Sequence, residues 1–333
     1  MHSRYIFVSV LCLVLTANST AEQPSCADVA VNVIQSTGVP IQGLTAVDFS
    51  AEIKKQSAPI QSVSPDSSPR RVLVILDATR DLSTEGRSAE EIFAAGLIES
   101  LQPEDSLGLL TARGAVREVK FGADRTRLRQ ALDSGANEQD KGKLGVLDAV
   151  AEGITWFGEP RLGDTIVLMA MDLGDNHKTN LKLVSKMLEE HRIRLFGVAF
   201  GHLLLMNQTL STQSMGREGF GQVRQGLPFS GPAGDADFLP LSVNSGGYIV
   251  AEDTASKRQE FKVTDAKKQE LQRTATAMAA IIDKVYAVRL QTSPGTHSES
   301  WALSLSHAKV QELPGARVLY PHDLTSCSQP SAH

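Results

Sequence analysis

Predominantly apolar runs alternate with segments of helical periodicity through the middle of the chain. The runs at 71–76, 165–170 and 193–200 are typical of parallel strands that are buried on both faces. A shorter strand pattern covers 106–110. Helical spacing is found over 88–101, 126–132, 145–156, 181–191 and 268–285. Strands that alternate with helices predict an α/β fold, a doubly wound, mostly parallel sheet flanked by helices.

The two ends of the chain have a different pattern. Residues 28–35 alternate apolar and polar side chains, as a half-buried strand does, and short strand patterns follow up to residue 63. Strand patterns return over 286–291, 301–305 and 317–319. The N-terminal segment, alone or together with the C-terminal strands, is therefore expected to form a small β-rich unit.

These patterns set the expected boundaries. We expect a signal peptide over residues 1–21, an N-terminal β-rich segment over 22–64 and a turn-rich linker over 65–70. An α/β domain with an insertion loop at 201–237 is expected over 71–292, and C-terminal strands with a tail over 293–333. The insertion is rich in Gly, Gln and Ser, and it is either a mobile excursion or a binding loop.

The N-terminus has the order of a secretory signal. A short basic start at His2 and Arg4 precedes the apolar run 5–16, and Ser19 and Ala21 offer small side chains at the −3 and −1 positions of a cleavage site. The run is short for a membrane span, although an uncleaved anchor is the alternative. The sequence therefore predicts export to the periplasm or beyond, without a membrane span in the mature chain.

The cysteines bear on a possible disulfide, and the net charge bears on the kind of partner. Removal of the signal leaves Cys26 and Cys327 at opposite ends of the mature chain, where they either form a disulfide in an oxidising compartment or remain two unrelated thiols. The formal net charge of −5 argues against a nucleic-acid partner, which would normally meet a basic face.

Acidic and hydroxyl side chains follow two of the predicted strands directly. Asp77, Thr79 and Asp81 come after the first apolar run, and Asp172 comes after the run 165–170. In open α/β sheets, ligands bind at the carboxyl ends of the strands, and oxygen ligands suit a hard cation such as Mg²⁺ or Ca²⁺. These four residues are the predicted metal ligands. The simpler alternative is that they cap helices and tighten turns.

This arrangement resembles the metal-ion-dependent adhesion site of von Willebrand factor type A (VWA) domains, whose motif is Asp-x-Ser-x-Ser, then a Thr, then an Asp. Other segments resemble an exported bacterial group of VWFA-related proteins: Gly43-Leu44-Thr45 to Asp48-Phe49, Leu147-Asp148-Ala149, Ser245-Gly246-Gly247 and residues 316–320. The resemblance covers nearly the whole mature chain and implies a VWA-like fold with a partner-binding edge.

The chain departs from that motif at two positions. Asp81 replaces the second Ser with a carboxylate, and the Thr of the motif falls near Leu144, whose side chain cannot coordinate a metal. The extra carboxylate would weaken the attraction of the site for an acidic partner residue. The adhesion site is therefore degenerate.

Three functions remain open at this stage. The first is a protein-binding module, dependent on Mg²⁺ or Ca²⁺ if the degenerate site still binds a cation. The second is a structural envelope protein whose metal site has decayed. The third is a metal-assisted hydrolase that uses Asp77, although no nucleophile-and-base pair and no catalytic motif is recognised, so we expect a non-enzymatic protein.

Overall fold

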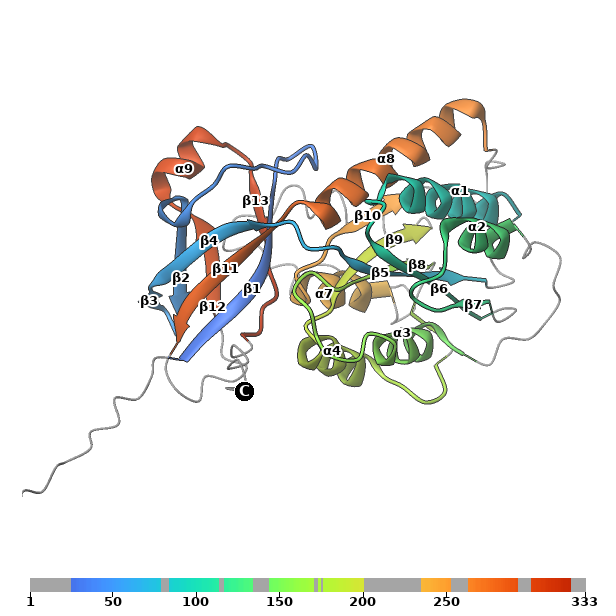
Figure 1. Ribbon diagram of the computed structural model, residues 1–333, viewed down its shortest axis with the longest axis horizontal. Coiled ribbons are helices and arrows are strands. Elements are labelled where there is room, and N and C mark those ends of the chain that lie inside the picture. Colours follow the sequence, from blue (N-terminus) through green and yellow to red (C-terminus); the bar gives the residue numbers. More distant parts are fainter. Residues whose placement is uncertain are drawn as a thin grey trace, which may run out of the picture.

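The computed structural model describes residues 25–78, 84–113, 117–133, 144–170, 173–174, 176–200, 235–252, 263–292 and 301–324. These residues form two lobes that lie side by side, a β-rich lobe on the left of Figure 1 and an α/β lobe on the right. The expected signal peptide, most of the expected insertion and Cys327 lie outside the described residues. Cys26 lies in a strand, but its side chain is likewise outside them, so the disulfide stays a prediction.

The α/β lobe is built on a six-stranded sheet in the order β10-β9-β8-β5-β6-β7. All neighbouring strands are parallel except β7, which runs antiparallel to β6 at one edge. The strands are β5 (Arg71–Asp77), β6 (Ser106–Ala112), β7 (Glu118–Val119), β8 (Thr165–Ala170), β9 (Arg194–Phe200) and β10 (Ile249–Glu252). The predicted doubly wound sheet is confirmed.

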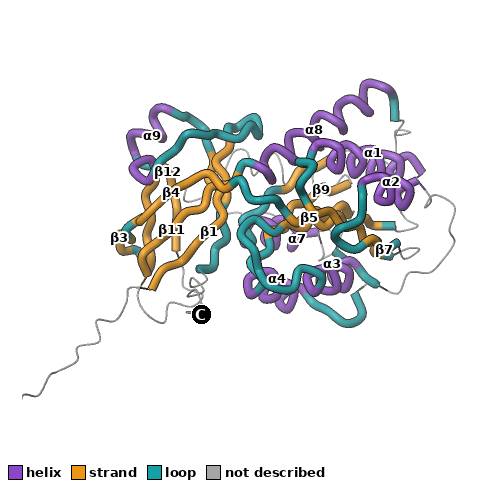
Figure 2. Tube along the Cα trace, viewed as in Figure 1, coloured by secondary structure: helices purple, strands orange, loops and turns teal. Residues whose placement is uncertain are grey.

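Helices cover both faces of this sheet (Figure 2). Because successive side chains of a strand point to opposite faces, Val72, Val74 and Leu76 of β5 enter one core, whereas Leu73 and Ile75 enter the other. The first core is closed by α1 (Thr84–Ser100), α2 (Arg125–Asp133) and α8 (Asp265–Asp283). The second is closed by α3 (Val146–Thr155), α4 (Leu181–Glu190) and α7 (Asp235–Asn244).

The β-rich lobe is made from the two ends of the chain. Its four-stranded sheet has the order β13-β1-β11-β4 and its three-stranded sheet the order β12-β2-β3. The strands are β1 (Ser25–Ile34), β2 (Phe49–Ile53), β3 (Gln56–Ala58), β4 (Ile60–Asp66), β11 (Val285–Thr292), β12 (Trp301–Leu305) and β13 (Arg317–Leu319). A 3₁₀ turn, η1 (Ala46–Asp48), and the helix α9 (His307–Glu312) flank them. Side chains from both sheets share one core, so the lobe is a small sandwich.

Two details differ from the expected boundaries. We expected β11 within the 71–292 unit, but its hydrogen-bonded neighbours are β1 and β4 of the β-rich lobe. Residues 235–237, expected in the insertion loop, form the first turn of α7. The local pattern correctly indicated a strand at β11, but its pairing with distant strands decides its lobe, and α7 begins earlier than the insertion was expected to end.

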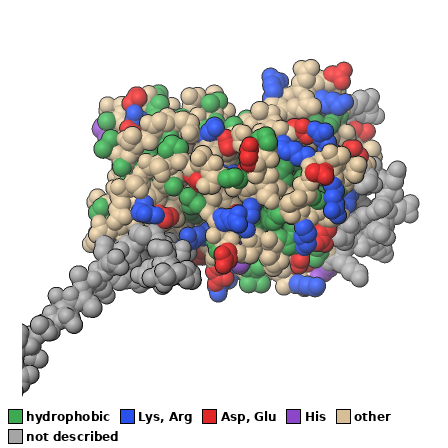
Figure 3. Space-filling model, in the orientation of Figure 1, with side chains coloured by type: hydrophobic (Ala, Val, Ile, Leu, Met, Phe, Trp, Pro, Cys, Tyr) green, Lys and Arg blue, Asp and Glu red, His purple; other side chains and the backbone are tan. Residues whose placement is uncertain are grey.

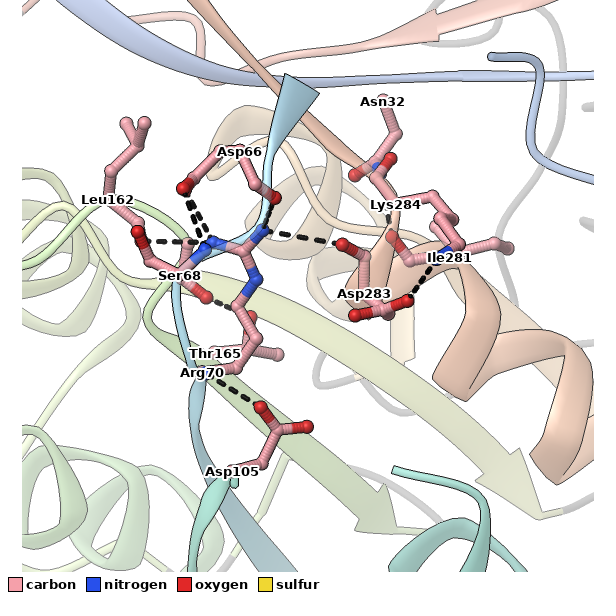
Figure 4. Close-up of polar contacts among 11 residues, drawn as sticks. Asn32, Asp66, Ser68, Arg70, Asp105, Leu162, Thr165, Ile281, Asp283 and Lys284 are labelled. Atoms are coloured by element: carbon pink, nitrogen blue, oxygen red, sulfur yellow. Dashed lines mark hydrogen bonds and ion pairs between the residues drawn. The ribbon is translucent and has the colours of Figure 1, made fainter. Parts of the chain in front are cut away.

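Buried arginines join the lobes. Figure 4 shows Arg70, between β4 and β5, with its guanidinium directed at the carboxylate and carbonyl of Asp66 and at the carbonyls of Leu162 and Asp283. Its backbone N–H donates to Asp105 at 2.7 Å. The side chain is 1% exposed, and these bonds replace the water that its two terminal nitrogens lose on folding. The short connection between the lobes is therefore fixed by one side chain.

A second buried arginine, in the α/β lobe, contacts the β-rich lobe. Arg194, at the start of β9, donates to the side-chain oxygen of Asn32 in β1 and, at 3.1 Å, to the carbonyl of Gly246. Asn32 in turn donates to the carbonyls of Ile281 and Lys284, both at 2.6 Å, where α8 ends. Burial, and secondarily the charge of Arg70, lowers the pKa of Arg194 to about 9. This polar chain links β1, β9 and the end of α8.

Candidate functional site

The candidate site lies where the strand order reverses. Counted from β5, the sheet has the order 3-2-1-4-5-6, with β5 and β8 adjacent at its centre. Connections from their carboxyl ends run to opposite faces, β5 to α1 and β8 to α4. This switch point is where doubly wound sheets bind ligands. Asp77 is the last residue of β5 and therefore stands at that point.

The carboxylate of Asp77 is paired with Arg113, the residue that follows β6. Because Asp77 is in register with Ala112, the next residue on the neighbouring strand lies beside it. Arg113 Nε donates to Asp77 Oδ1 at 2.8 Å, and a terminal guanidinium nitrogen of Arg113 donates to Asp77 Oδ2. The side chains are 0% and 8% exposed. This is a buried, bidentate ion pair.

Glu90 of α1 contacts the backbone of Asp77. Its carboxyl Oε1 accepts the backbone N–H of Asp77 at 3.1 Å, and the residue is 3% exposed. Burial, and then the negative charge of Asp77, raises the pKa of Glu90 well above its ordinary value. The centre of the site therefore combines an ion pair with a carboxyl group that resists ionisation.

Replacing Glu90 by glutamine is expected to stabilise the protein at pH 8 by about 1 kcal/mol or more. A carboxyl whose folded-state pKa is raised contributes most below its unfolded pKa and loses stability as pH rises towards the folded value. Glutamine stays neutral and keeps the acceptor for the Asp77 N–H. Urea unfolding at pH 5 and pH 8 checks this, with a larger gain expected at pH 8.

The matched control for this prediction is Glu91→Gln on the next position of α1. The pKa of Glu91 is also raised, chiefly by burial, but the charge of Arg117 opposes the rise and the group is only half-buried. A smaller gain is expected. A Glu90→Gln variant that is less stable than the wild type at both pH values would contradict the assignment.

Leu144 occupies the position that the VWA resemblance assigns to a threonine ligand. Its side chain packs against the core of α3, α4 and α7, and its carbonyl oxygen accepts the backbone N–H of Arg113 at 2.8 Å. Arg113 has a left-handed backbone, with φ of 54°. The residue at the position of the motif's threonine thus holds, through its carbonyl oxygen, the arginine that pairs with Asp77.

The loop after β8 is held by Asp148 in the first turn of α3. Its carboxylate accepts the backbone N–H groups of His177 at 2.8 Å and Lys178 at 3.1 Å. Burial alone would raise the pKa of Asp148, but these bonds and one from the Thr179 side chain outweigh it, so the pKa is lowered. The sequence singled out Asp148 as part of a motif, and the structure gives it this anchoring role.

Of the four predicted metal ligands, Asp77 is described, whereas Thr79, Asp81 and Asp172 lie outside the described residues. Over the described ranges, no group of three or more His, Cys, Asp or Glu side chains is placed to hold a metal ion. The described part of the site does not fit a divalent cation, because a guanidinium already neutralises Asp77 and Leu144 offers a hydrocarbon side chain.

Solved structures similar to this chain include three of bacterial proteins. The conserved hypothetical protein BatB of Bacteroides thetaiotaomicron is 14% identical, with 63% of this chain and 98% of that chain covered and a TM-score of 0.41. An aerotolerance-related membrane protein of Bacteroides fragilis is 13% identical, with 64% of this chain and 98% of that chain covered and a TM-score of 0.42. A von Willebrand factor type A protein of Catenulispora acidiphila is 9% identical, with 93% of this chain and 76% of that chain covered and a TM-score of 0.45. No family model matches the chain. No curated protein matches it either.

The α/β lobe has the doubly wound α/β architecture that the sequence predicts. The strand order and the helices on both faces establish the α/β architecture, and the likeness to these structures, at 9–14% identity, is one of fold alone. The expected α/β fold, a mostly parallel sheet flanked by helices, is confirmed by the strand order.

Proposed function

We propose that this protein is an exported, non-enzymatic protein-binding module that meets its partner at the carboxyl edge of the α/β sheet. The observation that carries the proposal is the pairing of Asp77 with Arg113 at the switch point. Among the described residues at the position favoured for ligand binding, the acid Asp77 is held in a buried ion pair, so recognition by the surrounding loops is better supported than chemistry.

The connections at this edge supply the proposed binding surface. The segment after β8 presents His177 and Lys178, which are exposed, on a backbone that Asp148 fixes. Strand β9 ends on the same edge at Phe200, and the expected insertion that follows it lies outside the described residues. Binding residues are commonly carried by loops on a rigid sheet.

A hydrolase based on Asp77 is disfavoured by the same geometry. An aspartate nucleophile needs access to its substrate, whereas Asp77 is 0% exposed and both of its carboxylate oxygens accept hydrogen bonds from Arg113. The remaining alternative is a structural envelope protein whose metal site has decayed. A position-specific contact with a partner distinguishes binding from that alternative.

Export is supported by the signal-like sequence of residues 1–21. No helix of the described residues is long and apolar enough to cross a membrane. Figure 3 shows basic and acidic side chains interspersed on the visible face, a distribution that suits a protein partner better than a nucleic acid.

Site-specific photo-crosslinking in the native cell envelope tests the binding edge. A photoreactive residue in place of Lys178 is expected to give a discrete adduct, because Lys178 is exposed beside the switch point. The matched control is Glu104, which is equally exposed in the turn before β6, at the opposite edge. Equal adducts at both positions, or none at Lys178, would argue for the structural alternative.

A further inference from the structure

We propose that the guanidinium of Arg113 is the resident cation of this edge of the sheet and takes the place of a divalent metal ion beside Asp77. The inference deepens the proposed function, because it makes partner binding at this edge independent of metal ions. Its starting point is the mismatch between the adhesion-site motif and the geometry at Asp77.

The pairing supplies Asp77 with what a metal ion would supply. Two parallel N–H groups of Arg113 meet the two carboxylate oxygens, and the planar guanidinium matches the planar carboxylate. The positive charge compensates the negative charge of an aspartate that is 0% exposed. A second cation at the same carboxylate would meet the charge of Arg113 at close range.

The backbone around Arg113 is arranged for this contact. A non-glycine residue with φ of 54° is uncommon and costs free energy, so the surrounding structure must hold it. The N–H of Arg113 donates to the carbonyl of Leu144, and the preceding carbonyl, that of Ala112, accepts the N–H of Ala78 at 2.9 Å. The turn thus ties the ends of β5 and β6 together with the chain that enters α3.

The loss of the threonine ligand at Leu144 and the pairing of Asp77 with Arg113 therefore belong together. Leu144 has no side-chain ligand to offer a metal, and its carbonyl fixes the arginine that makes the metal unnecessary. A merely decayed metal site would leave Asp77 buried without a counter-charge, which is costly. The structure instead shows a replaced cation.

Thermal unfolding with and without divalent ions tests the inference. MgCl₂, CaCl₂ or MnCl₂ is expected to leave the Tm of the wild type at the value measured in KCl of the same ionic strength. Arg113→Gln is expected to lower the Tm by on the order of 10 °C, because Asp77 loses its partner. The control Arg289→Gln breaks an exposed pair with Asp28 and is expected to change the Tm by about 2 °C or less.

A Tm that rises by several degrees with a divalent ion in the wild type, and does not rise in Asp77→Asn, would overturn the inference. The wild-type titration decides even if Arg113→Gln fails to fold. The adduct at Lys178 is expected to form equally in EDTA. Loss of that adduct in EDTA and its return with Mg²⁺ would overturn the inference but would still support the proposed binding function. Absence of the adduct in both conditions would count against the proposed function alone.

Discussion

Alanine in place of Gly247 is expected to lower the free energy of unfolding by about 3 kcal/mol or more. A Cβ at this position would lie 1.8 Å from the carbonyl oxygen of Leu195 in β9 and 2.5 Å from its carbonyl carbon. That oxygen already accepts the Ser242 hydroxyl at 2.6 Å, so the strand cannot move away without losing a buried hydrogen bond. Urea unfolding followed by circular dichroism measures the loss.

The control is Gly96→Ala in α1, where the nearest atom would be the Cβ of Ala275 at 3.3 Å. The tight contact and the better helix propensity of alanine oppose each other, so a change within about 1 kcal/mol is expected. Equal stability of the Gly247 and Gly96 variants would show that the backbone at Gly247 does not approach the carbonyl of Leu195 in β9 as described.

Asparagine in place of Asp77 is expected to cost about 3–5 kcal/mol, because the substitution leaves Arg113 buried without a counter-charge. The control is Asp28→Asn. Asp28 meets Arg289 with the same two-pronged geometry, at 2.7 and 2.8 Å, but these side chains are 28% and 50% exposed. The expected loss there is about 0–1 kcal/mol. Chemical denaturation of both variants in EDTA makes the comparison.

A metal-dependent site makes a different prediction for the same samples. If a divalent ion neutralised Asp77, EDTA would destabilise the wild type towards the level of Asp77→Asn. With Arg113 as the cation, EDTA leaves the wild type unchanged, and the large difference between the two proteins persists.

The α/β lobe could be predicted from sequence because its signals are local. Residues 72–76 of β5 and 166–170 of β8 are apolar without interruption, and both strands are buried on both faces. The alternation over residues 28–35 likewise placed β1. Sheet membership depends on distant partners, so the local pattern of β11 could not show that it pairs with β1 and β4.

The sequence also predicted that Asp77 lies at the end of a buried strand, but it did not predict that Arg113 pairs with it. An arginine after a strand is usually a solvated charge, and nothing in the local pattern at Arg113 indicates burial. The available signal was its position: it follows β6 directly, on the edge where Asp77 follows β5. Glu90 was missed for a similar reason, since a charged residue within an amphipathic helix is normally assigned to the exposed side.

A double-mutant cycle between Asp77 and Arg113 tests the central claim most directly. The free energy of unfolding is measured in EDTA for the wild type, Asp77→Asn, Arg113→Gln and the double variant. If Arg113 is the cation that neutralises Asp77, the double variant loses much less than the sum of the single losses, by about 2 kcal/mol or more. Losses that add to within about 0.5 kcal/mol would contradict the account.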